Sequence, residues 1–221
     1  MNYDKLIRPA FKEAIAAGGR EMVAKGLTVG TWGNLSLRDP ETGLIYVKPS
    51  AMKYETITPD DVVVFNDAME IVDGHRTPTI EYQFHIRIMQ ARADINAVIH
   101  THPVYSAALG TLDWDLPGIS EDFVQLVGEK IVNCEYALPG SEALAEHIVS
   151  ALGSERNAVM IPNHGTVCCG RDWDMAVKVC FVVEKAAHIY LLASSVGTPK
   201  LISPEDMAAM RDFARNHYGK K

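Results

Sequence analysis

Apolar side chains recur at helical spacing in several segments of the chain. In residues 5–25, Ile7, Phe11 and Ile15 fall near one face of a helix, and Gly26 marks its C-terminal end. Pro103 favours the start of another helix, and Ser141 is a good N-terminal cap for a third. The segments predicted to be helical are 5–25, 80–92, 103–110, 141–152, 173–196 and 204–217.

Shorter apolar runs between these helices predict strands. Residues 28–38 begin as a glycine-rich turn and continue as an alternating strand, and a turn at 39–43 leads into a return strand at 44–47. Further strands are predicted at 61–65, 96–99 and 158–161. Early hairpins followed by interleaved helices indicate an α/β fold with a mixed, mainly antiparallel sheet covered by helices. No linker rich in proline, glycine or serine divides the chain, so we expect residues 1–221 to form a single domain.

Composition and charge narrow the class of protein. Apolar residues make up 48% of the chain, and 28 acidic residues outnumber 21 basic ones, which leaves a net charge of −7. This apolar content excludes a mainly disordered chain, and the negative charge argues against nucleic acid and anionic membranes as partners. No apolar run approaches the ~18 residues of a membrane-spanning helix, and the N-terminus lacks a secretory signal, so we expect a cytoplasmic location. The four cysteines lack disulfide or redox spacing, and we interpret them as buried thiols.

Two histidines follow directly after a short apolar run. Residues i and i+2 of an extended chain point to the same side, so His100 and His102 can approach one ion together. His164 also follows an apolar strand, and Gly165 behind it permits a tight turn. Three imidazoles with one open or carboxylate position are the usual ligands of catalytic zinc, and Glu81, in the first turn of a predicted helix, is the best fourth ligand. Manganese, cobalt and iron accept similar ligands.

His85 lies four residues after Glu81 and therefore shares its helix face. It could bind the metal itself or orient a metal ligand through a hydrogen bond. The interpretation we favour is an ordinary core or surface histidine, because no further spacing pattern supports the other roles. The remaining histidines have no partner pattern and are interpreted in the same way: His75, His147, His188 and His217.

Five short motifs occur in order along nearly the whole chain. They are Gly-Thr-Trp-Gly-Asn-Leu-Ser at 30–36, Lys-Pro-Ser at 48–50, Pro-Thr-Ile-Glu at 78–81, His-Thr-His at 100–102 and Asn-His-Gly at 163–165. Each motif alone is weak, but together and in this order they resemble the class II aldolase/adducin head family. That family includes fuculose-1-phosphate aldolase and ribulose-5-phosphate 4-epimerase. The resemblance implies a three-layer α/β/α fold and a C4 homotetramer with active sites between subunits.

The resemblance also implies roles for individual residues. It implies that His100, His102 and His164 bind zinc, and that Glu81 is the catalytic carboxylate that contacts the metal. The phosphate pocket implied by the resemblance consists of Asn34, Ser50, Ala51, Thr79 and Ile80.

Two positions of that pocket depart from the family pattern. Many members have glycine where Ala51 stands and a serine where Ile80 stands, and a lost hydroxyl removes on the order of 1 kcal/mol or more of binding to a charged acceptor. Thr31 can add a donor, and Lys48 either adds charge or is a solvated loop residue. A non-phosphorylated substrate, or one with a differently placed acid group, is therefore an alternative to a sugar phosphate.

The function that these residues favour is a zinc-dependent retro-aldol cleavage of a small ketose phosphate or related hydroxy-keto substrate. Breaking a bond beside a carbonyl leaves an enediolate whose charge a metal can stabilise, while Glu81 acts as general acid/base. The aldolases resembled here carry glutamate at this position and the epimerases carry aspartate. A pentulose-5-phosphate 4-epimerase, a metal-dependent decarboxylase or dehydratase and, more distantly, a non-catalytic adducin-like interaction domain are the alternatives. A second acid/base is required, and the candidates are Glu121 or its neighbour Asp122, and Tyr218.

Overall fold

The computed structural model describes residues 3–217. Its helices are α1 (Pro9–Ala24), α2 (Tyr82–Ala91), α3 (Val104–Thr111), α4 (Glu121–Leu126), α5 (Glu142–Leu152), α6 (Trp173–Val196) and α7 (Pro204–Asn216). Its strands are β1 (Asn34–Arg38), β2 (Ile45–Val47), β3 (Val63–Phe65), β4 (Ile71–Asp73), β5 (Ala97–Thr101), β6 (Leu116–Pro117), β7 (Lys130–Ile131), β8 (Ala158–Ile161) and β9 (Gly165–Gly170). Two 3-10 turns, η1 (Tyr54–Thr56) and η2 (Pro59–Asp61), connect β2 to β3.

Seven of these strands form one sheet in the order β4-β3-β2-β1-β5-β9-β8, while β6 and β7 pair separately. Every pairing within the large sheet is antiparallel. A parallel contact occurs only as an isolated bridge between Asn133 and Met160 in the described part of the chain. β1 lies in the middle of the sheet, and its register against β5 places Asn34 opposite His100. The prediction of a mainly antiparallel sheet is confirmed, and within the described residues its strand pairings are all antiparallel.

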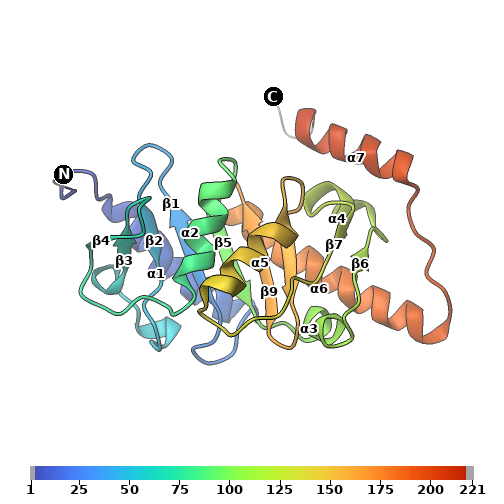
Figure 1. Cartoon of the computed structure of the whole chain (residues 1–221), viewed down its shortest axis with the longest axis horizontal. Coiled ribbons are helices and arrows are strands. Elements are labelled where there is room, and N and C mark those ends of the chain that lie inside the picture. The colour runs from blue at the N-terminus through green and yellow to red at the C-terminus, as the bar shows by residue number, and fades with distance from the viewer. Residues whose placement is uncertain (1–2, 218–221) are drawn as a thin grey trace.

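Helices cover both faces of this sheet, as Figure 1 shows. On one face α1, α3, α4 and α6 share an apolar core with strand residues such as Ile99 and Cys168. On the other face α2 and α5 share a second core with Val98 and Cys169. Neighbouring residues of β5 and β9 thus enter opposite cores, as the alternation of side chains along a strand requires. The three-layer α/β/α architecture implied by the resemblance is confirmed.

Strand β9 is the main element that the sequence pattern did not reveal. All of its residues are buried because helices cover both faces, so no apolar–polar alternation marks it. The short helix α4 was also missed, since it has only six residues and begins with two acidic ones. The first helix begins at Pro9 rather than at residue 5, because proline favours the first turn of a helix. The four cysteines are buried free thiols, as predicted.

Helix α6 runs from the sheet toward one end of the molecule, where α7 packs against α4 (Figure 1). The first part of α6 packs on β5 and β9 and buries Val179 and Val183, whereas Leu192 and Val196 near its end are exposed. Within residues 3–217, α6 is the one helix whose length and composition would allow it to cross a membrane, with a mean hydropathy of 1.5 over its apolar window. Core helices share that property, and the first part of α6 packs on β5 and β9, although only 28% of the apolar window is buried. The absence of a membrane partner stays a prediction.

Candidate metal centre and active-site pocket

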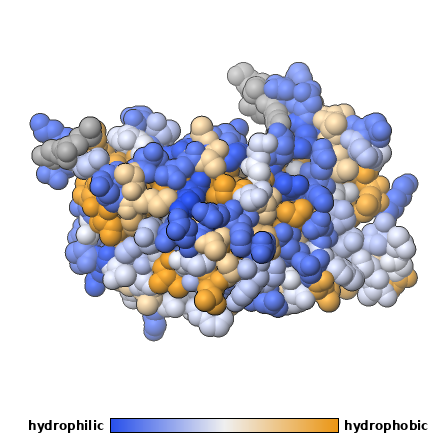
Figure 2. All heavy atoms as spheres, viewed as in Figure 1, coloured by the Kyte–Doolittle hydropathy of each residue, from blue (hydrophilic) through white to orange (hydrophobic). Residues whose placement is uncertain are grey.

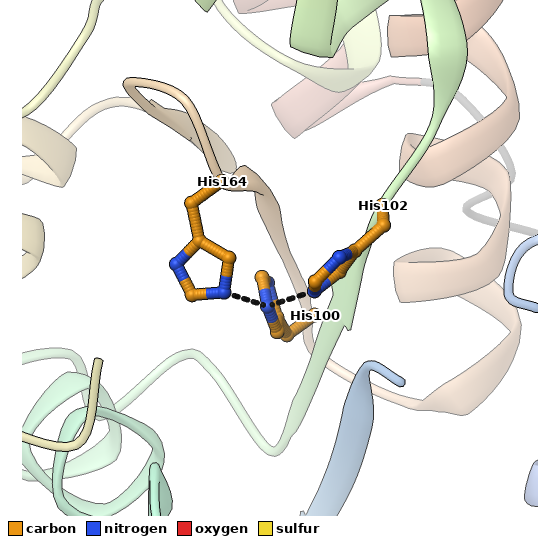
Figure 3. A group of neighbouring side chains, drawn as sticks. All are labelled: His100, His102 and His164. Carbon is orange, nitrogen blue, oxygen red and sulfur yellow. Dashed lines mark hydrogen bonds between the residues drawn. The ribbon is translucent and has the colours of Figure 1, made fainter. Parts of the chain in front are cut away.

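Three histidine rings converge at the end of two neighbouring strands (Figure 3). His100 belongs to β5 and His102 follows it by two residues, while His164 lies in the turn directly before β9. Because β5 and β9 are hydrogen-bonded to each other, their ends bring the rings together. The Nε2 atom of His100 lies 2.9 Å from Nε2 of His102 and 3.2 Å from Nε2 of His164. Within residues 3–217 this is the one group of three or more histidine, cysteine, aspartate or glutamate side chains with a geometry that could hold a metal ion.

Burial favours the neutral form of all three rings, and a hydrogen bond orients the ring of His100. The carbonyl oxygen of Thr166 lies 3.1 Å from Nδ1 of His100 and can only accept, so Nδ1 donates and the lone pair of Nε2 faces the other rings. Burial, assisted by the neighbouring His102, lowers the pKa of His100 to about 3. Burial and the nearby His100 lower the pKa of His164 to about 4, and burial also lowers the pKa of His102. All three imidazoles are therefore uncharged near neutral pH.

The carboxylate of Glu81 faces the same point. Its Oε2 atom lies 3.6 Å from Nε2 of His100, and its Oε1 atom lies 3.6 Å from Nε2 of His164. Glu81 is buried, and Oε1 has no hydrogen-bond partner among the described residues. Nitrogen lone pairs and a carboxylate oxygen directed at one another are unfavourable unless a cation lies between them. The donor set therefore fits a divalent metal ion with three nitrogen ligands and one carboxylate.

Two glycines allow close backbone approaches around this cluster. A side chain at Gly165 would bring its Cβ atom into collision with the carbonyl oxygen of Thr101. Gly33 has a φ of 74°, and a Cβ atom there would lie 2.6 Å from the carbonyl oxygen of His100. Only glycine combines this backbone conformation with so close a contact. Gly33 of the first motif and Gly165 of the last are thus required by packing around the histidines.

Asn34 connects Glu81 to the sheet. Its side-chain nitrogen Nδ2 donates to Oε2 of Glu81 at 2.8 Å and to Oγ1 of Thr79 at 3.0 Å. Glu81 immediately precedes α2, so the first turn of that helix fixes its backbone. One carboxylate oxygen of Glu81 is therefore anchored to Asn34, and the other is left without a protein partner among the described residues.

His85 is not a member of the histidine cluster. It lies on α2 and is fully buried, and its Nε2 atom contacts Oδ1 of Asn34 while its Nδ1 atom lies 2.7 Å from Oγ of Ser36. Burial, with a smaller contribution from His100, lowers the pKa of His85 well below its ordinary value. Of the roles left open by the sequence, these contacts fit a core histidine that orients a neighbour of Glu81 rather than a metal ligand.

A pocket of about 340 Å³ opens beside the cluster, and Glu81, His102 and His164 form part of its wall. The wall also contains every residue predicted to bind the substrate, namely Thr31, Asn34, Ser50, Ala51, Thr79 and Ile80. The remaining lining residues are Trp32, Gly33, Lys48 and Pro139. Trp32 had no role predicted from the sequence, although it lies within the first motif, and no sequence signal marked Pro139.

Lys48 brings a buried positive charge to this pocket, although a solvated loop lysine was the alternative. The residue is 1% exposed, and its Nζ atom lies 3.2 Å from the carbonyl oxygen of Pro49 and 3.5 Å from that of Thr31. It also lies 4.6 Å from the centre of the Tyr54 ring. In the described chain no carboxylate lies within ion-pair distance of Lys48, and burial lowers its pKa to about 8. A buried ammonium without an acidic partner suits an anionic ligand.

The predicted second acid/base residues do not line the pocket as the structure describes it. Glu121 is exposed at the first position of α4. Its neighbour Asp122 forms an ion pair with Lys185 of α6. Tyr218 lies outside the described residues. The catalytic roles of Glu121 and Tyr218 stay predictions.

Comparisons with known proteins agree with this arrangement. The sequence model of the family described as Class II Aldolase and Adducin N-terminal domain matches residues 13–191. The 5-deoxy-D-ribulose 1-phosphate aldolase of Bacillus thuringiensis serovar kurstaki is 35% identical over 208 residues, which cover 94% of this chain and 95% of the relative. The L-fuculose phosphate aldolase of Escherichia coli strain K12 is 32% identical over 191 residues, covering 86% of this chain and 87% of the relative.

A solved structure also resembles this chain closely. An L-fuculose 1-phosphate aldolase superposes with a TM-score of 0.91 at 32% identity, covering 95% of this chain and 98% of that one. The residues matched by the family model include the three clustered histidines, Glu81 and the whole lining of the pocket. The resemblance drawn from the five motifs is thereby confirmed. The chain belongs to the class II aldolase and adducin family, and within it to the metal-dependent enzymes that are aldehyde-lyases.

Proposed function

We propose that this protein is a zinc-dependent class II aldolase that cleaves a small ketose 1-phosphate into dihydroxyacetone phosphate and an aldehyde. One observation carries the proposal: three neutral imidazoles and a carboxylate converge beside a pocket that also contains a buried ammonium. The same cavity thus offers donors for a metal and a positive charge for an anion. Metal-assisted cleavage of a phosphorylated ketose requires both.

Zinc is the proposed ion because histidines with a carboxylate are frequent ligands of catalytic zinc. His100, His102 and His164 would hold it, with Glu81 as the fourth ligand. When bound, the ion supplies a Lewis acid that stabilises the negative charge developing on the substrate oxygens. Manganese, cobalt and iron accept the same donor atoms, and metal analysis of the purified protein distinguishes among them.

Glu81 is the proposed general acid/base at the reacting carbon. Its Oε2 atom accepts a hydrogen bond from Asn34 at 2.8 Å, while its buried Oε1 atom has no partner among the described residues. Oε1 is therefore the oxygen that is free to hold a proton and pass it on. Cleavage also requires the second acid/base to take the proton of the substrate hydroxyl that becomes the aldehyde carbonyl. As the bond beside the ketone carbonyl breaks, its electrons remain on the dihydroxyacetone phosphate half, and a proton from Glu81 to that carbon completes the reaction.

The phosphate group is proposed to bind at the Lys48 end of the pocket. Thr31, Ser50 and Thr79 offer further polar side chains in the pocket wall, whereas the amide of Asn34 is already hydrogen-bonded to Glu81, Thr79 and His85. Ala51 has a φ of 54°, a conformation that glycine adopts more readily, and Ile80 contributes no hydroxyl. In this proposal the buried charge of Lys48 replaces the contribution of the missing hydroxyl.

The aldehyde product is proposed to be short and to end in a methyl group. Relatives at 35% and 32% identity are named for 5-deoxy-D-ribulose 1-phosphate and L-fuculose phosphate, both of which are deoxy sugars. Trp32 and Ile80 in the pocket wall are 67% and 61% exposed, so they form an apolar rim. An apolar rim favours a methyl-ended aldehyde over a fully hydroxylated one.

We also propose that the chain forms a homotetramer in which neighbouring subunits complete each pocket. Large apolar side chains are exposed in the single chain, among them Val29, Trp32, Val104, Leu138 and Val196. Figure 2 shows apolar patches between hydrophilic regions on one face of the molecule. Because Glu121 does not line the pocket of its own chain, we propose that it acts, as Tyr218 would, in the pocket of a neighbour. A cytoplasmic location and a single domain stay predictions.

The proposal is tested with the metal-loaded protein and a panel of phosphorylated ketoses. We expect dihydroxyacetone phosphate, measured by coupled reduction with NADH, to form from 5-deoxyribulose 1-phosphate and fuculose 1-phosphate faster than from ribulose 1-phosphate. The Glu81→Gln variant is the control for cleavage by contaminants. Inversion of a pentulose 5-phosphate at C4 without cleavage would identify the protein as an epimerase instead. Release of carbon dioxide from a keto acid would identify it as a decarboxylase.

A further inference from the structure

A buried series of polar side chains leads from the interior to Glu81. Ser36 of β1 and His85 of α2 are both 0% exposed. The Oγ atom of Ser36 lies 2.7 Å from Nδ1 of His85, and Nε2 of His85 is hydrogen-bonded to Oδ1 of Asn34. The Nδ2 atom of Asn34 in turn lies 2.8 Å from Oε2 of Glu81. Side chains of β1 and of the start of α2 thus form one continuous hydrogen-bonded series.

The direction of each hydrogen bond follows from the Glu81 end. A carboxylate oxygen only accepts, so the amide nitrogen of Asn34 faces Glu81 and its carbonyl oxygen faces His85. That carbonyl also only accepts, so Nε2 of His85 carries the proton. Burial keeps the ring neutral, which makes Nδ1 an acceptor and the hydroxyl of Ser36 the donor. The second amide hydrogen of Asn34 goes to Thr79, whose Oγ1 atom is 3.0 Å away.

Regular secondary structure brings the members of the series together. Asn34 and Ser36 are two residues apart in a strand, so their side chains point to the same side of the sheet. Glu81 and His85 are four residues apart at the start of α2, so they lie one helical turn apart on the same side. Ser36 and His85 have hydrogen bonds within this series but do not line the pocket. Their influence on Glu81 therefore passes through Asn34.

We propose that His85 is a positioning residue for this enzyme, because it fixes the amide of Asn34 in the orientation that holds Oε2 of Glu81. Ser36 supports this role by fixing the tautomer of His85. The inference rests on the proposed function of Glu81 as acid/base. With Oε2 held, the carboxylate cannot rotate, and Oε1 stays directed toward the reacting atoms. Without His85 the amide of Asn34 is free to flip and to present its oxygen to the carboxylate, which repels it.

The test uses the purified, metal-loaded, full-length protein. His85→Leu and Ser36→Ala interrupt the series at different points, whereas His85→Gln keeps one donor and one acceptor. Gln83→Ala, on the same helix, is the matched control. The measurements are bound metal per chain, unfolding temperature, kcat and KM for cleavage, and the rate at which the protein exchanges the C3 hydrogen of dihydroxyacetone phosphate in deuterated water.

The expected pattern separates positioning from a general structural effect. We expect His85→Leu to lower kcat and the exchange rate about 10- to 100-fold with metal content unchanged. His85→Gln should recover most of this loss, and Ser36→Ala should lose about 2- to 10-fold, the equivalent of one neutral hydrogen bond. Gln83→Ala should match the wild type. Rescue by glutamine is the result that a role limited to packing would not produce.

Other outcomes contradict the proposal. Wild-type exchange in a fully metallated His85→Leu, or a loss of metal that matches its loss of activity, would overturn the positioning role. If His85→Leu does not fold, Ser36→Ala and His85→Gln test the positioning role instead. An unchanged kcat of Ser36→Ala, together with an inactive His85→Gln, would contradict that role. Nitrogen NMR of histidine-labelled protein adds a readout that needs no substrate. The Nε2–H tautomer is expected for His85, and an Nδ1–H tautomer would refute the inference even if the wild type cleaved no sugar phosphate at all.

Discussion

The metal end and the anion end of the pocket are constructed differently. At the metal end, His100 and His164 are attached to the paired strands β5 and β9. A hydrogen bond to Thr166 orients the ring of His100, and a hydrogen bond from Asn34 orients the carboxylate of Glu81. At the anion end, Lys48 follows β2 and contacts loop carbonyl oxygens and the ring of Tyr54.

This difference suggests that the metal end carries out the reaction and that the anion end determines which substrate binds. Groups held by a sheet keep one geometry, which suits the bond-breaking step common to the proposed aldolase and its alternatives. Groups carried by loops tolerate replacement, as Ala51 and Ile80 illustrate in this chain, and they can adapt to a different substrate. Substitutions at the metal end should therefore abolish turnover, whereas substitutions at the anion end should shift KM.

The largest effect is expected at the metal end, from His100→Ala. Removal of a ligand should release the ion and lower turnover ~1,000-fold or more, because a Lewis acid contributes several kcal/mol of transition-state stabilisation. Metal content by mass spectrometry and cleavage rate are the measurements. His147→Ala, which changes a histidine on α5 outside the pocket, is the control and should retain both. A metal-free His100→Ala protein that still turns over normally would show that the cluster has no catalytic role.

Glu81→Gln should produce the next largest effect. Glutamine keeps the size and the hydrogen-bonding oxygen but cannot take up the proton, so turnover should fall about 10²- to 10⁴-fold. The three histidines remain, and the bound metal should stay near the wild-type amount. Rate and metal content measured on the same sample check this. Near-normal turnover of the glutamine variant would remove Glu81 from the mechanism.

Lys48→Met should affect binding more than turnover. A hydrogen bond to a charged group contributes ~1.5–3 kcal/mol, so KM for a ketose 1-phosphate should rise about 10- to 100-fold while kcat changes little. Inorganic phosphate should also weaken as a competitive inhibitor by a similar factor. An unchanged inhibition constant for phosphate would move the anion site elsewhere.

The lowered pKa of Lys48 gives this end of the pocket a pH dependence. In the free protein the ammonium is charged below a pH of about 8 and neutral above it. The charged form binds the anion, so KM should rise as the pH increases through this value, and bound phosphate should shift the transition upward. Lys48→Met should lose the effect on the alkaline side. A wild-type KM that stays constant across this range would contradict the role of Lys48.

Ile80→Ser should produce the smallest effect. It introduces the hydroxyl that many family members carry at this position, and one additional hydrogen bond of about 1 kcal/mol should lower KM by about 5-fold. The aldehyde preference should shift toward more polar products, because the apolar rim is reduced. Kinetics with deoxygenated and hydroxylated ketose 1-phosphates measure both effects. A higher KM would mean that Ile80 contacts the aldehyde end alone.

The parts of the site that the sequence predicted depend on local patterns. His100 and His102 are two residues apart at the end of an apolar strand, and His164 directly precedes a glycine after another such strand. Glu81 and the pocket residues came from short motifs in a fixed order, and the structure brings them together in one wall. The spacing of the histidines is a property of the sequence itself, whereas the roles of the pocket residues followed from the family resemblance that the ordered motifs carry.

The parts that escaped prediction depend on contacts between distant segments. The sequence left the role of His85 open and favoured an ordinary histidine, and only its contacts with Ser36 and Asn34 in the fold decide between the roles. The burial of Lys48 depends on how the loop after β2 folds against Tyr54. β9 gave no alternation because both of its faces are covered. Glu121 requires a partner chain for its proposed role, and a single sequence does not describe one.

The attachment of the histidines to a paired sheet has a consequence for how the enzyme acquires its ion. The strands are held by two apolar cores that do not depend on the metal. Removal of the metal with a chelator should therefore leave a folded apoenzyme in which the metal ligands keep their arrangement. The metal-free protein can then bind an ion again without refolding. Exchange of one transition metal for another should change the reactivity of the site and leave the fold unchanged.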